Sequence, residues 1–216
     1  MTYSFKSSRA LTVLSLGAGA ALSAAPAFAH HFMGGRAPQT LTDGLLSGLA
    51  HPIIGVDHLL FLVAIALLSL LLRTPARYAV PALFVLGTLA GTAMDLGGGA
   101  EPAVLPFVEP LVALSVVVGG ALLLFRPGVG VTVLAALFSA AGLVHGVAYA
   151  QSIVGAEASA LGAYLIGFTL IQYLVIVAGT IAAERLGLAA RASRTRRGVG
   201  GALALAGTFI LFGSWG

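Results

Sequence analysis

The feature that most constrains this chain is a series of six apolar segments, each long enough to cross a lipid bilayer. A membrane-spanning helix needs about 20 predominantly apolar residues. Only 8% of the 216 residues are charged and 59% are hydrophobic, whereas a soluble domain carries about 25% charged residues. We therefore predict an all-α integral membrane protein with a six-helix transmembrane bundle. Its spans lie at 52–72, 78–96, 104–125, 129–150, 158–183 and 199–215.

The same composition excludes several classes of protein. So few charged side chains cannot cover a soluble globule, which excludes a soluble enzyme domain, a disordered chain and a nucleic-acid-binding protein. The sequence contains no cysteine, so it has no disulfide, no thiolate metal ligand and no cysteine nucleophile. Any metal ligands must therefore be nitrogen or oxygen atoms.

The first 29 residues have the pattern of a secretory signal peptide. Lys6 and Arg9 precede an apolar stretch at 10–22, and Ala27-Phe28-Ala29 is a small-x-small cleavage pattern. The alternative is a first membrane helix that is not cleaved. Both interpretations place residue 30 on the outer side of the membrane, and six spans then place the C-terminus outside as well.

The basic residues predict the same orientation. If residue 30 is outside, the connections on the inner side contain eight arginines and the outer segments contain one, Arg36. Short loops rich in Lys and Arg stay on the cytoplasmic side. The eight predicted inner residues are Arg73, Arg77, Arg126, Arg185, Arg191, Arg194, Arg196 and Arg197.

Two local features bear on how the spans begin and pack. Pro52 suits the first position of a helix, where its missing N–H costs nothing, so we expect residues 41–50 to form a separate interfacial helix or outward extension. A continuous helix from Leu41 would instead have to kink at Pro52. Glycines at four-residue spacing let helices approach closely, and they occur as Gly87 with Gly91 and as Gly142 with Gly146.

A few ionisable residues enter the spans, and such residues are costly in a bilayer unless they have a function or a partner. Counted from the predicted span ends, they fall in one layer in the outer half of the membrane, and none falls in the inner half. Their nitrogen and oxygen atoms suit divalent Ni, Co, Zn or Fe. The predicted metal ligands are His51, Asp57, His58, Glu109 and His145, with Asp95, His30 and His31 as weaker candidates.

Each of these residues also has a structural interpretation. His145 or Glu109 could hold helices together by hydrogen bonding, His51 could mark a helix start, and Asp95 could be a helix-end residue. Asp57 could be a ligand itself, or it could accept a hydrogen bond that fixes a histidine tautomer. His30 and His31 would follow the cleavage site, where a free amine and two imidazoles could chelate a metal.

The motif residues resemble those of a known family. His51-Pro-Ile-Ile-Gly55-Val-Asp57-His58 resembles the HPxxGxDH pattern of the HupE/UreJ nickel/cobalt permeases. The segment from Pro106 to Gly119 is similar to that family's third-span pattern through Glu109, Ala113 and Ser115-Val116. The resemblance implies a multi-pass protein of the bacterial inner membrane. It departs from the family at three positions, where Tyr149, Ser152 and Ile176 replace an expected His, acid and His.

Three functions are consistent with these features. The first is a secondary permease for a divalent transition metal, most simply nickel or cobalt. The second is a membrane metal sensor or assembly subunit that binds metal without moving it. The third is a metal-dependent intramembrane hydrolase. We favour the permease. It implies that the protein is not an enzyme, that it holds no tightly bound cofactor, and that its partners are the bilayer and the ion, with no nucleic acid.

Overall fold

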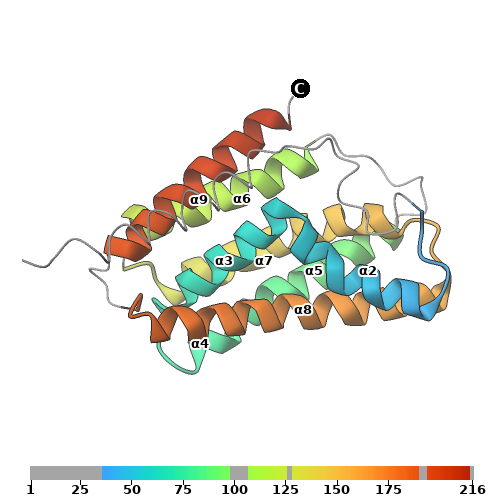
Figure 1. Ribbon diagram of the computed structural model, residues 1–216, viewed down its shortest axis with the longest axis horizontal. Coiled ribbons are helices and arrows are strands. Elements are labelled where there is room, and N and C mark those ends of the chain that lie inside the picture. The colour runs from blue at the N-terminus through green and yellow to red at the C-terminus, as the bar shows by residue number, and fades with distance from the viewer. Residues whose placement is uncertain (1–35, 98–106, 126–127, 190–193, 215–216) are drawn as a thin grey trace, which may run out of the picture.

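The computed structural model describes residues 36–97, 107–125, 128–189 and 194–214, and these residues are helical with no strand among them. The predicted signal peptide, His30 and His31 lie outside the described residues. The elements in chain order are α2 (Leu41–Ile54), α3 (Val56–Ser69), α4 (Ala76–Ala79), α5 (Pro81–Gly97), α6 (Val108–Phe125), α7 (Val131–Ala150), the 3-10 turn η2 (Gln151–Ile153), α8 (Ala158–Arg185) and α9 (Arg194–Gly213) (Figure 1).

The helices confirm the all-α prediction. Four are long and apolar enough to cross a membrane: Ala76–Gly97, Val108–Phe125, Val131–Ile153 and Ala158–Arg185. The pair α2 and α3 makes a fifth when it is counted as one broken span. Helix α9 carries Arg194, Arg196 and Arg197 at its start. The sixth span and the membrane orientation therefore remain predictions.

The predicted start of the first span at Pro52 is wrong. Helix α2 begins earlier, because Thr40 and Asp43 form a capping box in which each side chain accepts the other residue's backbone N–H. Pro52 then lies inside the last turn of α2, where it has no N–H to give the helix. The chain is extended at Gly55 and α3 starts at an angle of 73° to α2, so the alternative of a kinked helix from Leu41 is closer to the structure.

Three helix pairs form the bundle, and glycines lie at their contacts. Within each of the pairs α2–α8 and α5–α7 the two helices are parallel. Gly44 lies against Ala160 and Gly48 against Tyr164, and Gly87 lies against Ser139 and Gly91 against Leu143. The pair α6–α9 is antiparallel, because Gly120 lies against Ala204 and Gly207 against Val117. Each direction is the one that six alternating spans would give.

The predicted glycine pairs on α5 and α7 are confirmed as sites of close approach. A Cβ added at Gly91 would overlap the backbone oxygen of Leu143, and one added at Gly142 would overlap that of Phe84. The hydroxyl of Thr92 also donates to the backbone oxygen of Gly146 at 2.8 Å across this contact. Small residues and a cross-helix hydrogen bond are the main means of joining helices in lipid.

Helix α3 is the centre of the molecule. It packs against α6, α8 and α9 as well as α2, and Figure 1 shows it between the α6–α9 pair and the long α8. The side chains of Phe61, Leu62, Ile65 and Leu68 are wholly buried. Because α3 follows directly from the break at Gly55, its first turn places Asp57 and His58 inside the bundle.

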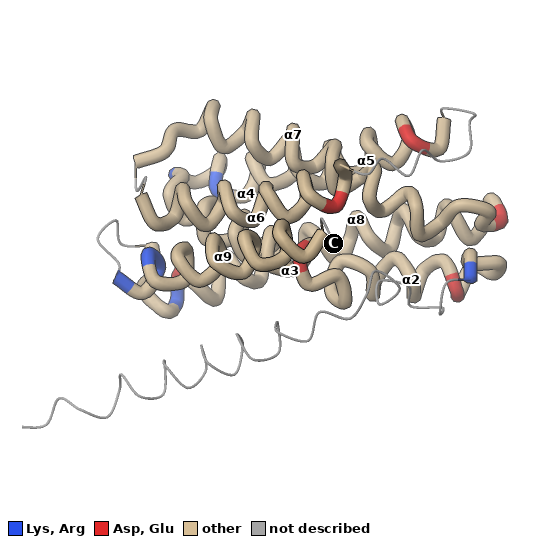
Figure 2. The backbone as a smooth tube through the Cα atoms, turned by 90° about the horizontal axis from the view of Figure 1, so that it is seen from above, with Lys and Arg blue, Asp and Glu red and all other residues tan. Residues whose placement is uncertain are grey.

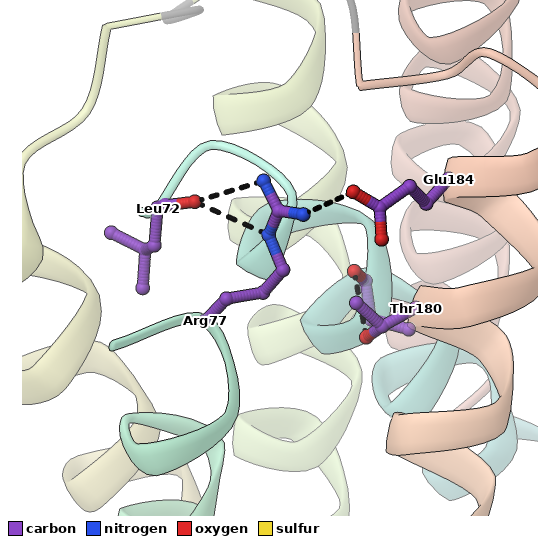
Figure 3. A network of polar contacts seen from close by, with 5 residues as sticks. Leu72, Arg77, Thr180 and Glu184 are labelled. Atoms are coloured by element: carbon purple, nitrogen blue, oxygen red, sulfur yellow. Dashed lines mark hydrogen bonds and ion pairs between the residues drawn. The ribbon is translucent and has the colours of Figure 1, made fainter. Parts of the chain in front are cut away.

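Charges separate along the long axis of the molecule. Figure 2 shows the basic residues gathered at one end, apart from one near the start of α2, with most of the acidic residues in the middle and at the other end. At the basic end Arg77 forms an ion pair with Glu184 and donates two hydrogen bonds to the backbone oxygen of Leu72 (Figure 3). This contact connects the loop after α3 to the end of α8. The separation of charges agrees with the predicted orientation, in which the basic end faces the cytoplasm.

Candidate metal site

Three of the predicted site residues come together at the break between α2 and α3. His51 lies in the last turn of α2, His58 in the first turn of α3, and His145 near the end of α7. The ring centroids of His51 and His58 are 5.6 Å apart, and those of His58 and His145 are 4.9 Å apart. All three side chains are buried. The helix break thus gathers imidazoles from three helices into one cluster.

A hydrogen-bonded chain links two of these histidines to α6. Nδ1 of His58 lies 3.0 Å from Nδ1 of His145, and Nε2 of His145 lies 2.9 Å from Oγ of Ser115. The Ser115 hydroxyl donates to the backbone oxygen of Val112 at 2.6 Å, so it accepts from Nε2–H of His145. Neutral His145 then accepts at Nδ1 from Nδ1–H of His58, which leaves the basic lone pair of His58 on Nε2.

Tyr149, four residues after His145 on α7, lies among the imidazoles. Its ring centroid is 4.4 Å from that of His58 and 5.1 Å from that of His51. The side chain is fully buried, and its hydroxyl has no hydrogen-bond partner among the described residues. Tyr164 on α8 also contacts His51, with ring centroids 6.4 Å apart, and its hydroxyl is 3.0 Å from Oγ of Ser152.

The break itself places Asp57 and His58. One carboxylate oxygen of Asp57 accepts the backbone N–H of His58 at 2.8 Å. A carboxylate in the first turn of a helix offsets the positive end of the helix dipole. A Cβ at Gly55 would lie 2.6 Å from Cδ2 of His58. A glycine at this position therefore leaves room for the His58 ring beside the break.

The other predicted ligands do not join the cluster. Glu109 is exposed in the first turn of α6, and Ser115, about 9 Å further along that helix, is the α6 residue that reaches His145. Asp95 is half-buried near the end of α5. Within the residues that the structure describes, no three His, Asp or Glu side chains are close enough together to hold a metal ion.

Some residues of this region had no role in the predicted site. Ser115 appeared only as part of a family pattern, and neither Tyr164 nor Gln172 was singled out. Gln172 is fully buried on α8, with Nε2 donating to the backbone oxygen of Phe168 at 2.9 Å. Tyr164 and Thr180 are also buried on α8, but residues eight apart on a helix are rotated by about 80° from one another, so no single-face pattern in the sequence marked these residues.

Comparison with known proteins decides the family. The sequence profile described as HupE / UreJ protein matches residues 18–210. Protein HupE of Rhizobium leguminosarum bv. viciae is 34% identical over 191 residues, which cover 88% of this chain and 93% of that protein. The chain belongs to the HupE/UreJ family. No solved structure matches it significantly.

Membership of the HupE/UreJ family confirms the resemblance inferred from the motifs. The family consists of transporters and accessory proteins, not enzymes, which removes the intramembrane hydrolase from consideration. Of the three departures from the family pattern, Tyr149 contacts the histidine cluster, and Ser152 is hydrogen-bonded to Tyr164 beside it. Ile176 lies in the main hydrophobic core, about 18 Å along α8 from Tyr164.

Proposed function

We propose that this HupE/UreJ protein is a secondary permease that moves a divalent transition metal, nickel or cobalt, across the bacterial inner membrane. The observation that carries the proposal is the cluster of His51, His58 and His145 at the break of a broken membrane helix. Transporters bind their substrates at discontinuous helices near the middle of the bilayer. Buried imidazoles in a membrane are functional candidates because they are costly to keep there.

The break suits a cation on electrostatic grounds. The C-terminal end of α2, which carries His51, is the negative end of that helix dipole, and such ends coordinate cations in broken transporter helices. The N-terminal end of α3 would repel a cation, but the carboxylate of Asp57 lies there. The net field at the break therefore favours a positive ion over an anion.

The proposed path has an outer capture step and a binding step. His30, His31 and Asp95 are the proposed outer residues. The proposed ligands at depth are His51, Asp57, His58 and His145, with Glu109 joining by rotation of its exposed side chain. The imidazoles replace part of the ion's water shell, which requires the hydrogen bond between His58 and His145 to open. Because the sequence has no nucleotide-binding motif, an ion gradient or a partner protein supplies the energy.

The proposal is tested by measuring nickel and cobalt uptake in cells with and without the protein. We expect His58→Ala and His145→Ala to abolish uptake and Asp57→Ala to reduce it strongly, at equal amounts of protein in the membrane. Thr208→Ala is a matched control, because that hydroxyl donates only to its own helix, at Ala204. Uptake should also fall at acid pH, because an imidazole must lose its proton to bind a metal.

The same experiment separates the permease from a sensor or assembly subunit. If the purified protein binds nickel or cobalt through His58 and His145 but the cells that contain it show no uptake, the sensor or assembly subunit is favoured. That alternative is supported by Tyr149 and Ile176, which stand where the family pattern has histidines. Uptake that is equal with and without the protein would overturn the permease.

A further inference from the structure

The hydroxyl group of Tyr149 has no structural explanation in the bundle. The side chain is fully buried and its oxygen has no hydrogen-bond partner among the described residues. A buried hydroxyl without a partner destabilises a protein, because it has given up its hydrogen bonds to water. Phenylalanine would fill the same space without that cost. Packing alone therefore does not explain why this position carries a hydroxyl group.

The surroundings of this hydroxyl differ from those of the neighbouring tyrosine. The Tyr164 hydroxyl is paired with Ser152 at 3.0 Å, so its role is met within the protein. The Tyr149 ring instead contacts His58 and His51, at centroid distances of 4.4 and 5.1 Å, and lies 6.4 Å from His145. It is the one non-imidazole ring in contact with all three histidines among the ring contacts of the described residues.

We infer that Tyr149 determines which divalent cation the site accepts, because its hydroxyl oxygen contacts the cation held by the three imidazoles. This inference rests on the proposed function, since it names a further contact to the same substrate. Once the hydrogen bond between His58 and His145 has opened to admit the ion, the site becomes a mixed set of three nitrogens and one phenol oxygen. Oxygen ligands favour harder cations such as Mn²⁺, and imidazole favours Ni²⁺, Cu²⁺ and Zn²⁺. A phenol among three imidazoles thus moderates the preference of the site for the softer ions.

Two substitutions at this position test the inference. Tyr149→Phe removes only the oxygen, and Tyr149→His replaces it with a fourth imidazole. Affinities of the purified full-length protein in detergent are measured by titration with Ni²⁺, Co²⁺, Zn²⁺ and Mn²⁺. Tyr173→Phe is the matched control, because that hydroxyl donates to the backbone oxygen of Tyr78 at 3.2 Å, away from the histidines.

We expect Tyr149→Phe to bind Ni²⁺ and Co²⁺ about tenfold more weakly, a loss of the size seen for supporting groups at metal sites. It should unfold at the same or a higher temperature, because it loses an unpaired buried hydroxyl. Tyr149→His should raise the ratio of Zn²⁺ to Mn²⁺ affinity above that of the unaltered protein. Tyr173→Phe should leave all four affinities unchanged.

Two results would overturn the inference. One is a Tyr149→Phe protein with the same four affinities as the unaltered chain. The other is an equal loss for all four ions in both variants, which would mean that Tyr149 only packs. Neither result bears on the uptake measurement, so the protein can still be a permease if Tyr149 does not have this role. Selective binding that depends on Tyr149, without uptake in cells, would support the inference and overturn transport.

Discussion

At the scale of single residues, His145 is held at both of its ring nitrogens. One ring nitrogen is engaged by His58 at 3.0 Å and the other by Ser115 at 2.9 Å. Partners that hold the second nitrogen of a histidine fix its tautomer and its ring orientation, and they are worth about 10–100-fold in metal affinity. Ser115 on α6 therefore acts on the site through His145.

We predict that Ser115→Ala lowers the affinity for nickel uptake about tenfold, with little change in the amount of folded protein. The reason is that His145 loses the acceptor that holds its Nε2–H and is free to change tautomer or rotate. Ser69→Ala is the control, because that buried hydroxyl donates to its own helix at Ile65 and touches none of the histidines. Concentration-dependent uptake measures the effect. Equal behaviour of the two serine variants would contradict this role for Ser115.

At the scale of helices, the packing depends on places where one backbone touches another. Gly91 and Gly146 put α5 and α7 in direct contact, and Gly44 does the same for α2 and α8. Lipid is as apolar as the side chains, so no hydrophobic driving force holds membrane helices together, and close van der Waals packing must do so. Gly91 and Gly146 thus fix the position of α7, which carries His145, against α5.

We predict that Gly91→Ala destabilises the bundle, by about 1–3 kcal/mol as for other overpacked contacts. The added methyl would overlap the backbone oxygen of Leu143, so α5 and α7 must move apart. Gly162→Ala is the matched control, because nothing lies within 4 Å of the added carbon, and alanine is the better helix former by about 0.5–1 kcal/mol. Thermal unfolding in detergent should show a lower midpoint for the first variant only. Equal midpoints would mean that the contact tolerates the methyl group.

At the scale of the whole molecule, the basic residues define one end. Arg73 and Arg77 follow α3, Arg185 ends α8, and Arg194 begins α9. A cluster of arginines next to the apolar helices stays on the cytoplasmic side and is attracted by anionic lipid there. The opposite end of the bundle, with the loop between α7 and α8, would then face outward.

The absence of natural cysteines makes this orientation easy to test, because one introduced cysteine is the only reactive thiol. We predict that Ser159→Cys, exposed at the start of α8, reacts with a membrane-impermeant maleimide in intact cells. Thr74→Cys, exposed in the loop after α3, should react only after the membrane is permeabilised. Labelling is read as a shift in gel mobility. The reverse pattern would invert the topology and place the histidine cluster nearer the inner surface.

Sequence alone was sufficient for the properties that depend on local composition. Long apolar segments specify helices in lipid, because each backbone polar group must find its partner within the segment. The glycine spacing on α5 and α7 correctly predicted close contacts, because residues four apart lie on one face of a helix. The HPxxGxDH pattern identified the family for a similar reason, since its residues lie close together in the chain.

The tertiary structure decided which residues meet, because meeting depends on the packing of helices that are distant in sequence. Gly55 and Pro52 bend the first span by 73°, and that bend brings His51 to His58, which contacts His145. Glu109 stays exposed, about 1.7 turns from Ser115 on the same helix. No local pattern shows that Tyr149 has a buried, unpartnered hydroxyl. The sequence by itself determined a helical HupE/UreJ membrane protein with histidines in its spans. The packing around the broken helix decided which of them form one cluster, because helix contacts set the distances between side chains that the chain order leaves open.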